Sequence, residues 1–296
     1  MNTNRVKNIL ISLLTITALA LGGLILAEGG RYTLSAAQEN AVIDLLARNN
    51  IELHADILRD FRPMRALALE RYDHNEDIEN FVSRFFGDHD PNPAIEGNSL
   101  FFYTEDWGLV MAYLHEENIL FFEIADGFTN DAFAASPGGG TAEQLAIEFI
   151  THIFGAPDDL ELHSIVFGSD GEYIITFFSS YHGNILYNNR IRVRVDTVGI
   201  TNVLYSRVAN HSHTGDARAI FSADEALMAL MNHLRQTQVT GRDGRILLTQ
   251  MYMAYFLQDN RGVPSYVFTI YLGNNLRFNY IFNAFTNEFL TYEIIR

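Results

Sequence analysis

The chain contains no cysteine among its 296 residues. A disulfide framework is therefore excluded, and so are a lipid attached at a processed cysteine and catalysis by a cysteine nucleophile. Any domain outside the cytoplasm must be held together by packing alone, which suits a Gram-positive type of bacterium. Hydrophobic residues make up 48% of the chain, and that fraction is ample for stable cores.

Positive charge is also scarce, because Lys7 is the only lysine and 20 basic residues stand against 36 acidic ones. The formal net charge is −16 at pH 7. Nucleic acids and anionic lipid surfaces attract basic proteins and repel acidic ones. We therefore expect no nucleic-acid partner for this protein.

Familiar catalytic and cofactor motifs are missing as well. The sequence has no Gly-x-Ser-x-Gly, no His-Glu-x-x-His and no calcium-loop pattern. The glycines at 138–140 lack the Gly-Lys-Ser/Thr ending of a phosphate loop. We expect a protein that is not an enzyme and holds neither cofactor nor metal. Carboxylates and histidines are scattered, so a site assembled only in space stays open as an alternative.

The longest uncharged run, residues 9–27, contains neither charge nor proline. As a helix rising about 1.5 Å per residue it would be about 28 Å long, close to the ~30 Å hydrocarbon core of a bilayer. Arg5 and Lys7 precede the run, which favours a cytoplasmic tail at 1–8 and an extracytoplasmic body. We predict a single-pass protein of the cell membrane. The alternative is a signal peptide cleaved near Ala27.

Small residues recur four apart within this predicted membrane helix, and such spacing lets a second helix approach closely. The residues expected to face a partner's helix are Thr15, Ala18, Gly22, Gly23 and Ala27. The competing interpretation is that small residues are simply frequent in membrane helices.

Helix and strand patterns alternate after the membrane segment, which predicts an α+β body. Its first part, 28–135, opens with a helix capped by Ser35 and followed by apolar runs of strand length. Those runs are at 66–72, 100–103, 109–114 and 119–124, with a second helix at 77–86. Pro137 and three glycines predict a flexible or turn-rich linker at 136–140.

The remainder, 141–296, repeats one pattern. Thr141-Ala-Glu-Gln144 and Ser222-Ala-Asp-Glu225 each cap a predicted helix, and apolar runs joined by turn residues follow each helix. We therefore predict two tandem units, 141–212 and 222–296, in which a helix packs on an antiparallel β-meander. Units of about 75 residues are marginal alone, so we expect the two to pack on each other.

Alternation along the predicted strands indicates sheets with one face in water. At 190–195, arginine alternates with isoleucine and valine, so that one face carries Arg190, Arg192 and Arg194. Three guanidinium groups on one face fit a carboxylate or phosphate partner. The alternative is pairing with the abundant Glu and Asp of neighbouring strands.

His211 and His213 form a His-x-His pair beside Asp216, and His182 occupies another predicted turn. Two imidazoles and a carboxylate are ligands for a transition metal, but the spacing identifies no third fixed ligand. Histidines in polar turns are also commonly just solvated. The sequence leaves the role of the His211 and His213 pair open.

The layout as a whole resembles the YycI/YycH family of accessory proteins, and the YycI branch in particular. Local likenesses are Arg31-Tyr-Thr-Leu-Ser35, Phe61-Arg-Pro-Met64 and the final hairpin from Gly262 to Glu288. This ending is also similar to a PepSY-type helix-plus-meander unit. Asn287 occupies a turn position where such units often carry glycine, and asparagine tolerates the left-handed conformation.

The resemblance implies a non-enzymatic regulator anchored in the lipid bilayer. Members of the family associate with a membrane sensor histidine kinase of a two-component system, together with a related YycH-like accessory protein. The membrane helix would contact the kinase's helices, and the external body would contact the kinase's sensor domain or the YycH-like protein. A secreted PepSY-like binding or protease-inhibitory module is the alternative, and an envelope enzyme is a third reading.

Mass spectrometry of the mature N-terminus separates the anchored form from the secreted one. We expect the protein recovered from membranes to retain residues 9–27, because the apolar run is long for a signal peptide. Recovery from the medium of a chain beginning near Glu28 would contradict the anchor.

Overall fold

The computed structural model describes residues 32–72, 75, 78–79, 92–96, 99–104, 108–114, 119–155, 159–168, 171–258, 261–273 and 276–295. The predicted membrane helix at 9–27 lies outside these residues, together with the tail at 1–8 and most of the helix predicted at 77–86. Among the helices that the structure describes, none combines the length and apolar character needed to cross a bilayer.

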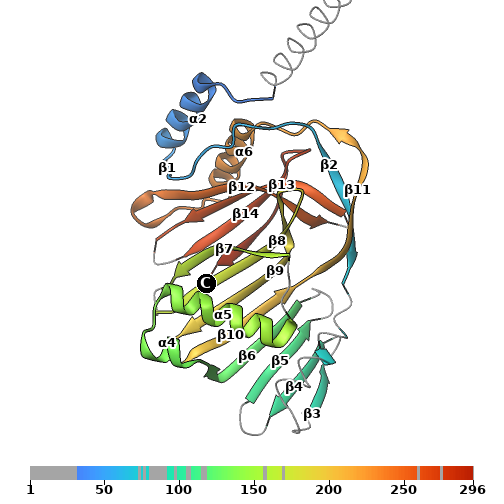
Figure 1. Ribbon diagram of the computed structural model, residues 1–296. Coiled ribbons are helices and arrows are strands. Elements are labelled where there is room, and N and C mark those ends of the chain that lie inside the picture. Colours follow the sequence, from blue (N-terminus) through green and yellow to red (C-terminus); the bar gives the residue numbers. More distant parts are fainter. Residues whose placement is uncertain are drawn as a thin grey trace, which may run out of the picture.

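The described strands join in one hydrogen-bonded network of fifteen, most of it antiparallel and arranged as three four-stranded meanders (Figure 1). The first meander consists of β3 (Asn92–Glu96), β4 (Ser99–Thr104), β5 (Gly108–Leu114) and β6 (Ile119–Phe128). The second consists of β7 (Leu160–Phe167), β8 (Tyr173–Tyr181), β9 (Asn184–Asp196) and β10 (Gly199–Ser206). The third consists of β12 (Ile246–Gln258), β13 (Arg261–Tyr271), β14 (Arg277–Asn283) and β15 (Phe289–Ile295). The predicted α+β class is confirmed.

A helix covers one face of the second meander and another covers one face of the third (Figure 1). α5 (Gly139–Phe154) packs on the second and buries Leu145 completely. α6 (Ala223–Gln236) packs on the third and buries Leu230 completely. Both helices carry apolar residues at helical spacing, so each presents one stripe to its sheet. These two assemblies correspond to the tandem helix-plus-meander units expected from the sequence.

Two of the predicted helix caps are confirmed. Ser35 forms a capping box with Gln38 at the start of α2 (Ala36–Arg48), and Ser222 forms one with Glu225 at the start of α6. Beyond α2, the short strand β1 (Ile51–Leu53) pairs parallel with β12, and the single turn η2 (Arg242–Gly244) precedes β12. The chain's N-terminal part is thereby attached to the third meander.

The connection at 136–140 carries the chain directly from α4 (Asp131–Ala135) into α5. Gly139 and Gly140, which fall in the predicted linker, form the start of α5. Thr141 lies inside the helix, and its hydroxyl lies 3.0 Å from the carbonyl oxygen of Gly138. The predicted cap at Thr141 is therefore wrong by three residues, since Gly138 is the N-cap. Glycine is a poor helix former, and a glycine run favours a loop on sequence grounds.

Strand β11 (Val208–Arg218) occupies the polar stretch between the two predicted units. It pairs antiparallel with β2 (Met64–Arg71), which also pairs with β13, and the two long strands run side by side in Figure 1. A polar turn was predicted here because Asn, His, Ser, Thr and Gly follow one another without an apolar face. Backbone pairing makes this segment a strand, and its register shifts twice.

The second and third meanders stack by the faces that their helices leave uncovered. A small apolar cluster joins them, with Phe178 and Tyr187 on one side and Val267 and Ile281 on the other. The prediction of a water-exposed face on these sheets is therefore wrong for the second unit, where Arg190 retains only 8% exposure. Each sheet covers the half-polar face of the other.

Replacing Leu230 by Ala tests the core under α6. We expect the free energy of unfolding to fall by about 2–5 kcal/mol, because the side chain is completely buried and a cavity would remain. Met228 on the same helix is 38% exposed, so Met228→Ala is the matched control and should cost much less. Equal shifts of the urea midpoint in the two variants would contradict this account of α6.

Candidate functional site

The three arginines of the β9 row have carboxylates of the same chain as partners, and for Arg190 and Arg192 the partner lies in the third meander. Arg190 donates from its two terminal nitrogens to Glu293 Oε2 and Oε1, at 2.6 and 2.7 Å. Arg192 Nη1 donates to Glu293 Oε1 at 3.1 Å, and Arg194 lies 3.9 Å from Glu172. The geometry therefore agrees with the alternative given for this row, in which the arginines pair with acidic residues of the same chain. For Arg190 and Arg192 the acid comes from the facing sheet and not from an adjoining strand.

Glu293 belongs to a row of polar side chains that crosses the third meander from strand to strand. The register sets Glu293 opposite Asn279 and Asn279 opposite Thr269. Thr269 in turn lies opposite Gln250 on β12. The Thr269 hydroxyl donates to Asn279 Oδ1 at 2.7 Å, and Asn279 Nδ2 donates to the Tyr187 hydroxyl at 3.0 Å. Tyr187 then donates to Glu293 at 2.6 Å, so the network crosses between the sheets.

A shorter polar row crosses the second meander on the facing side. Ser164 of β7 lies opposite Thr176 of β8, and Thr176 lies opposite Arg192 of β9. A pocket of about 170 Å³ lies between the two rows and is lined by strands of both meanders. The pocket exists only because the two units stack.

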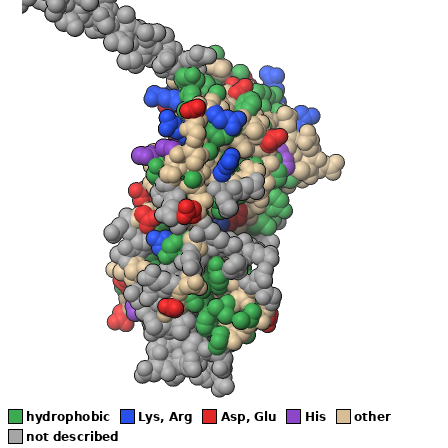
Figure 2. All heavy atoms as spheres, turned by 90° about the vertical axis from the view of Figure 1, so that its right-hand side faces the viewer, with side chains coloured by type: hydrophobic (Ala, Val, Ile, Leu, Met, Phe, Trp, Pro, Cys, Tyr) green, Lys and Arg blue, Asp and Glu red, His purple; other side chains and the backbone are tan. Residues whose placement is uncertain are grey.

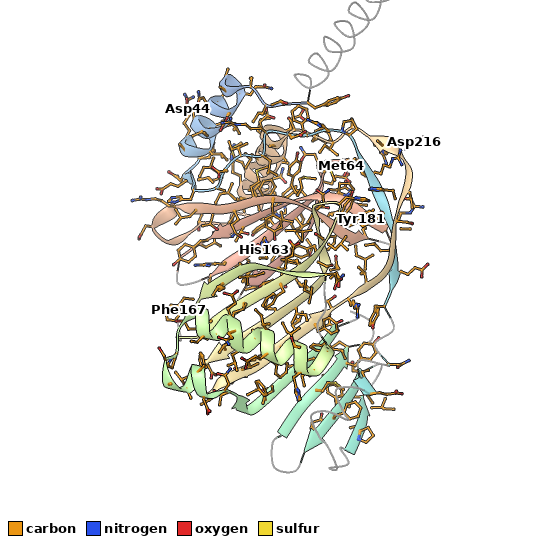
Figure 3. All side chains as sticks on the ribbon, in the orientation of Figure 1. Asp44, Met64, His163, Phe167, Tyr181 and Asp216 are labelled. Carbon is orange, nitrogen blue, oxygen red and sulfur yellow. The ribbon has the colours of Figure 1, made fainter. Side chains whose placement is uncertain are left out.

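A β-bulge lies beside this pocket in the first strand of each unit. The register of β7 shifts at His163, which is labelled in Figure 3. Both His163 and Ser164 line the pocket. The register of β12 shifts at Thr249, and both Thr249 and Gln250 line it. A bulge re-aims a side chain that regular alternation would turn to the other face. Two strands at equivalent places in the repeat are thus adapted to the pocket.

The interface between the second and third meanders is called the seam below, and the charged groups within it shift one another's pKa values strongly. Burial alone would raise the pKa of Glu293, but the charges of Arg190 and Arg192 outweigh burial and hold it at about 2. Burial, reinforced by the charge of Glu293, raises the pKa of the Tyr187 phenol, which stays a neutral donor. Burial also lowers the pKa of His163, so its imidazole is neutral at pH 7.

The predicted histidine group is partly assembled at another place. His213 of β11 stacks on His182 of the β8–β9 turn, with ring centroids 5.4 Å apart and planes 7° apart. Tyr181 packs edge-on against both rings. Burial lowers the pKa of His213, and the neighbouring His182 and Arg65 add to that effect. Among the described side chains, no three His, Asp or Glu form a metal-binding group.

Basic and histidine side chains gather mostly on the upper half of the face that carries β2 and β11, as Figure 2 shows. The expected membrane contacts lie outside the described residues: Thr15, Ala18, Gly22, Gly23 and Ala27.

Sequence reasoning missed Glu293, Tyr187 and the pocket. One signal was present, because Glu293 is the only charged residue within β15, a strand of otherwise apolar or neutral residues. A lone carboxylate in such a strand indicates a buried partner of opposite charge. The identity of that partner depends on how the two sheets stack.

Comparisons with protein-family models and with curated proteins find no match. The solved structures to which this chain is similar include an uncharacterised protein from Eubacterium rectale. The two chains are 11% identical with a TM-score of 0.48, and the match covers 82% of this chain and 91% of that one. Another is the C-terminal domain of YpeB from Bacillus megaterium, which is 11% identical with a TM-score of 0.36. That match covers 77% of this chain and 99% of the YpeB domain. Likenesses at this level assign no residue a role here.

Replacing Glu293 by Gln keeps the size of the side chain and removes its charge. We expect the free energy of unfolding to fall by about 3–5 kcal/mol, because two buried guanidinium groups lose their carboxylate. Glu52→Gln, which removes the acid of the exposed pair with Arg245, is the control and should leave the urea midpoint unchanged. An unchanged midpoint for Glu293→Gln would contradict the role given to this residue.

The difference in unfolding free energy between wild type and Glu293→Gln should depend on pH in a direction that the pKa of Glu293 sets. The pKa of Glu293 is depressed on folding from 4.5 to about 2, so the unfolded chain binds more protons between these values. The carboxylate's contribution, on the order of 3 kcal/mol, is fully present above pH 4.5 and is lost as the pH falls toward 2. The stability difference between wild type and Glu293→Gln should shrink over that window.

Proposed function

We propose that this protein is a non-enzymatic, membrane-anchored extracytoplasmic module that regulates a two-component sensor histidine kinase. The observation that carries the proposal is that the buried charged side chains of the described body pair with one another. Arg190, Arg192 and Glu293 are committed to one another across the seam between the sheets. Ion pairs of this kind fix the two sheets relative to each other. A recognition module requires such a fixed scaffold to present its binding surfaces.

The uncharged run at 9–27 supports the anchor, since its length matches a bilayer. An anchor confines this protein and the kinase to one plane, which raises their effective concentration without any new contact. The net charge of −16 also disfavours adsorption of the body to an anionic lipid surface. The external body is then available to the kinase's sensor domain or to a YycH-like accessory protein.

The membrane contact is tested by adding bulk to the small residues of the anchor. We expect the double variant Gly22→Leu, Gly23→Leu to lose co-purification with the kinase and to change kinase output, because helices separated by larger side chains pack poorly. The measurement is crosslinking in membranes followed by pull-down and mass spectrometry. Thermal unfolding should be unchanged, since the body is not altered.

Ala20→Leu is the control, because it places the same leucine side chain at a small residue outside the four-residue spacing. It should leave both co-purification and kinase output at the wild-type level. A double variant that still co-purifies with the kinase and signals normally would refute contact through this face of the helix.

A further inference from the structure

We infer that the pocket between the second and third meanders is a binding site for a small organic carboxylate carrying one ring or a similarly compact apolar group. The pocket has a volume of about 170 Å³. Apolar cavities of about 150 Å³ accept a single six-membered ring, whereas sites for drug-sized ligands start at about 300 Å³. The volume therefore selects a ligand of roughly ten non-hydrogen atoms.

The charge of the seam favours an anion. Arg190, Arg192 and Arg277 are three cations at or beside the pocket, and Glu293 is the carboxylate that two of them share. Among the described residues that line the pocket there is no Asp or Glu. A local excess of positive charge inside a chain of net charge −16 is the reverse of what composition alone would produce.

Two of the arginines keep donors for a ligand. Arg277 lines the pocket and makes no ion pair with any residue that the structure describes. Arg192 Nη1 donates to Glu293, whereas the other terminal nitrogen of Arg192 makes no hydrogen bond with the part of the chain that the structure describes. A carboxylate that accepts from this nitrogen and from Arg277 would gain charge-assisted hydrogen bonds.

Another part of the lining is aromatic. The ring of His163 lies 5.0 Å from Phe178 and 4.9 Å from Tyr252, measured between centroids, and all three residues line the pocket. The bulge in β7 directs His163 to this place. A ligand with a carboxylate at the arginines and an apolar ring against these aromatics satisfies both sides. Phosphate alone would leave the aromatic side without a partner.

Isothermal titration of the full chain in mild detergent, with empty micelles as the blank, tests the inference with three probes. Benzoate has the carboxylate and the ring, benzamide has the same shape without the charge, and inorganic phosphate has the charge without the ring. We expect benzoate to bind with a dissociation constant of about 1 mM or lower, and both other probes to bind at least about tenfold more weakly. Equal affinity for benzoate and benzamide, equal affinity for benzoate and phosphate, or no binding of benzoate would overturn the inference.

Two variants assign the binding to this pocket. Arg277→Gln should weaken benzoate about tenfold, while the matched control Arg261→Gln, at an exposed position of β13 outside the pocket, should not. Val166→Phe fills the pocket from β7 without changing charge and should abolish benzoate binding, which keeps the test decisive if Arg277→Gln unfolds. Wild-type affinity in Val166→Phe would overturn the assignment. The measurement needs neither kinase nor YycH-like protein, so it can fail separately from the proposed function.

Discussion

The carboxylate of Glu293 is the group on which the arrangement of the two sheets depends. It receives hydrogen bonds from Arg190, Arg192 and Tyr187, all of which belong to the facing meander. A buried ion pair of this kind adds little net stability compared with apolar residues of the same shape, but breaking it is expensive. The ion pair therefore selects one arrangement of the two sheets, because other ways of stacking them would leave two guanidinium groups buried without an acid.

The repeated unit explains why such a connection is needed. A helix covers one face of each meander, and about 75 residues cannot bury both faces of a sheet against their own chain. The uncovered faces carry arginine, threonine, asparagine and glutamine among apolar residues. Stacking buries the apolar cluster around Phe178 and Val267 only if the polar side chains find partners in the same step. The transverse row from Thr269 to Glu293 meets that requirement.

The same stacking produces the pocket, and this links the fold to the proposed role. Bulges at His163 and Thr249 turn additional side chains into the seam, at the cost of regular pairing in two strands. The proposed recognition module would thus carry a small-molecule site of its own between the two units. Ligand bound there would contact both units, so it would favour the stacked arrangement over any looser one.

Some elements of this fold could be predicted from the local sequence pattern, and others could not. The capping boxes at Ser35 and Ser222 and most of the strands were predictable, because a cap is decided within four residues and a strand by alternation within eight. The start of α5 was missed, since the glycines before Thr141 resemble a loop. Strand β11 was missed because its pairing with β2 joins segments more than a hundred residues apart and needs no apolar face.

For this protein, the sequence by itself determined the α+β class, the repeat of helix and meander, the acidic character, the uncharged run at 9–27 and the alternation that puts three arginines on one face. Only the tertiary structure decided that this face meets Glu293 instead of water, and that a pocket lies between the units. The reason is physical: periodicity specifies which side of a strand a residue occupies, whereas the partner across a sheet interface depends on register and stacking, which no local segment of the chain contains.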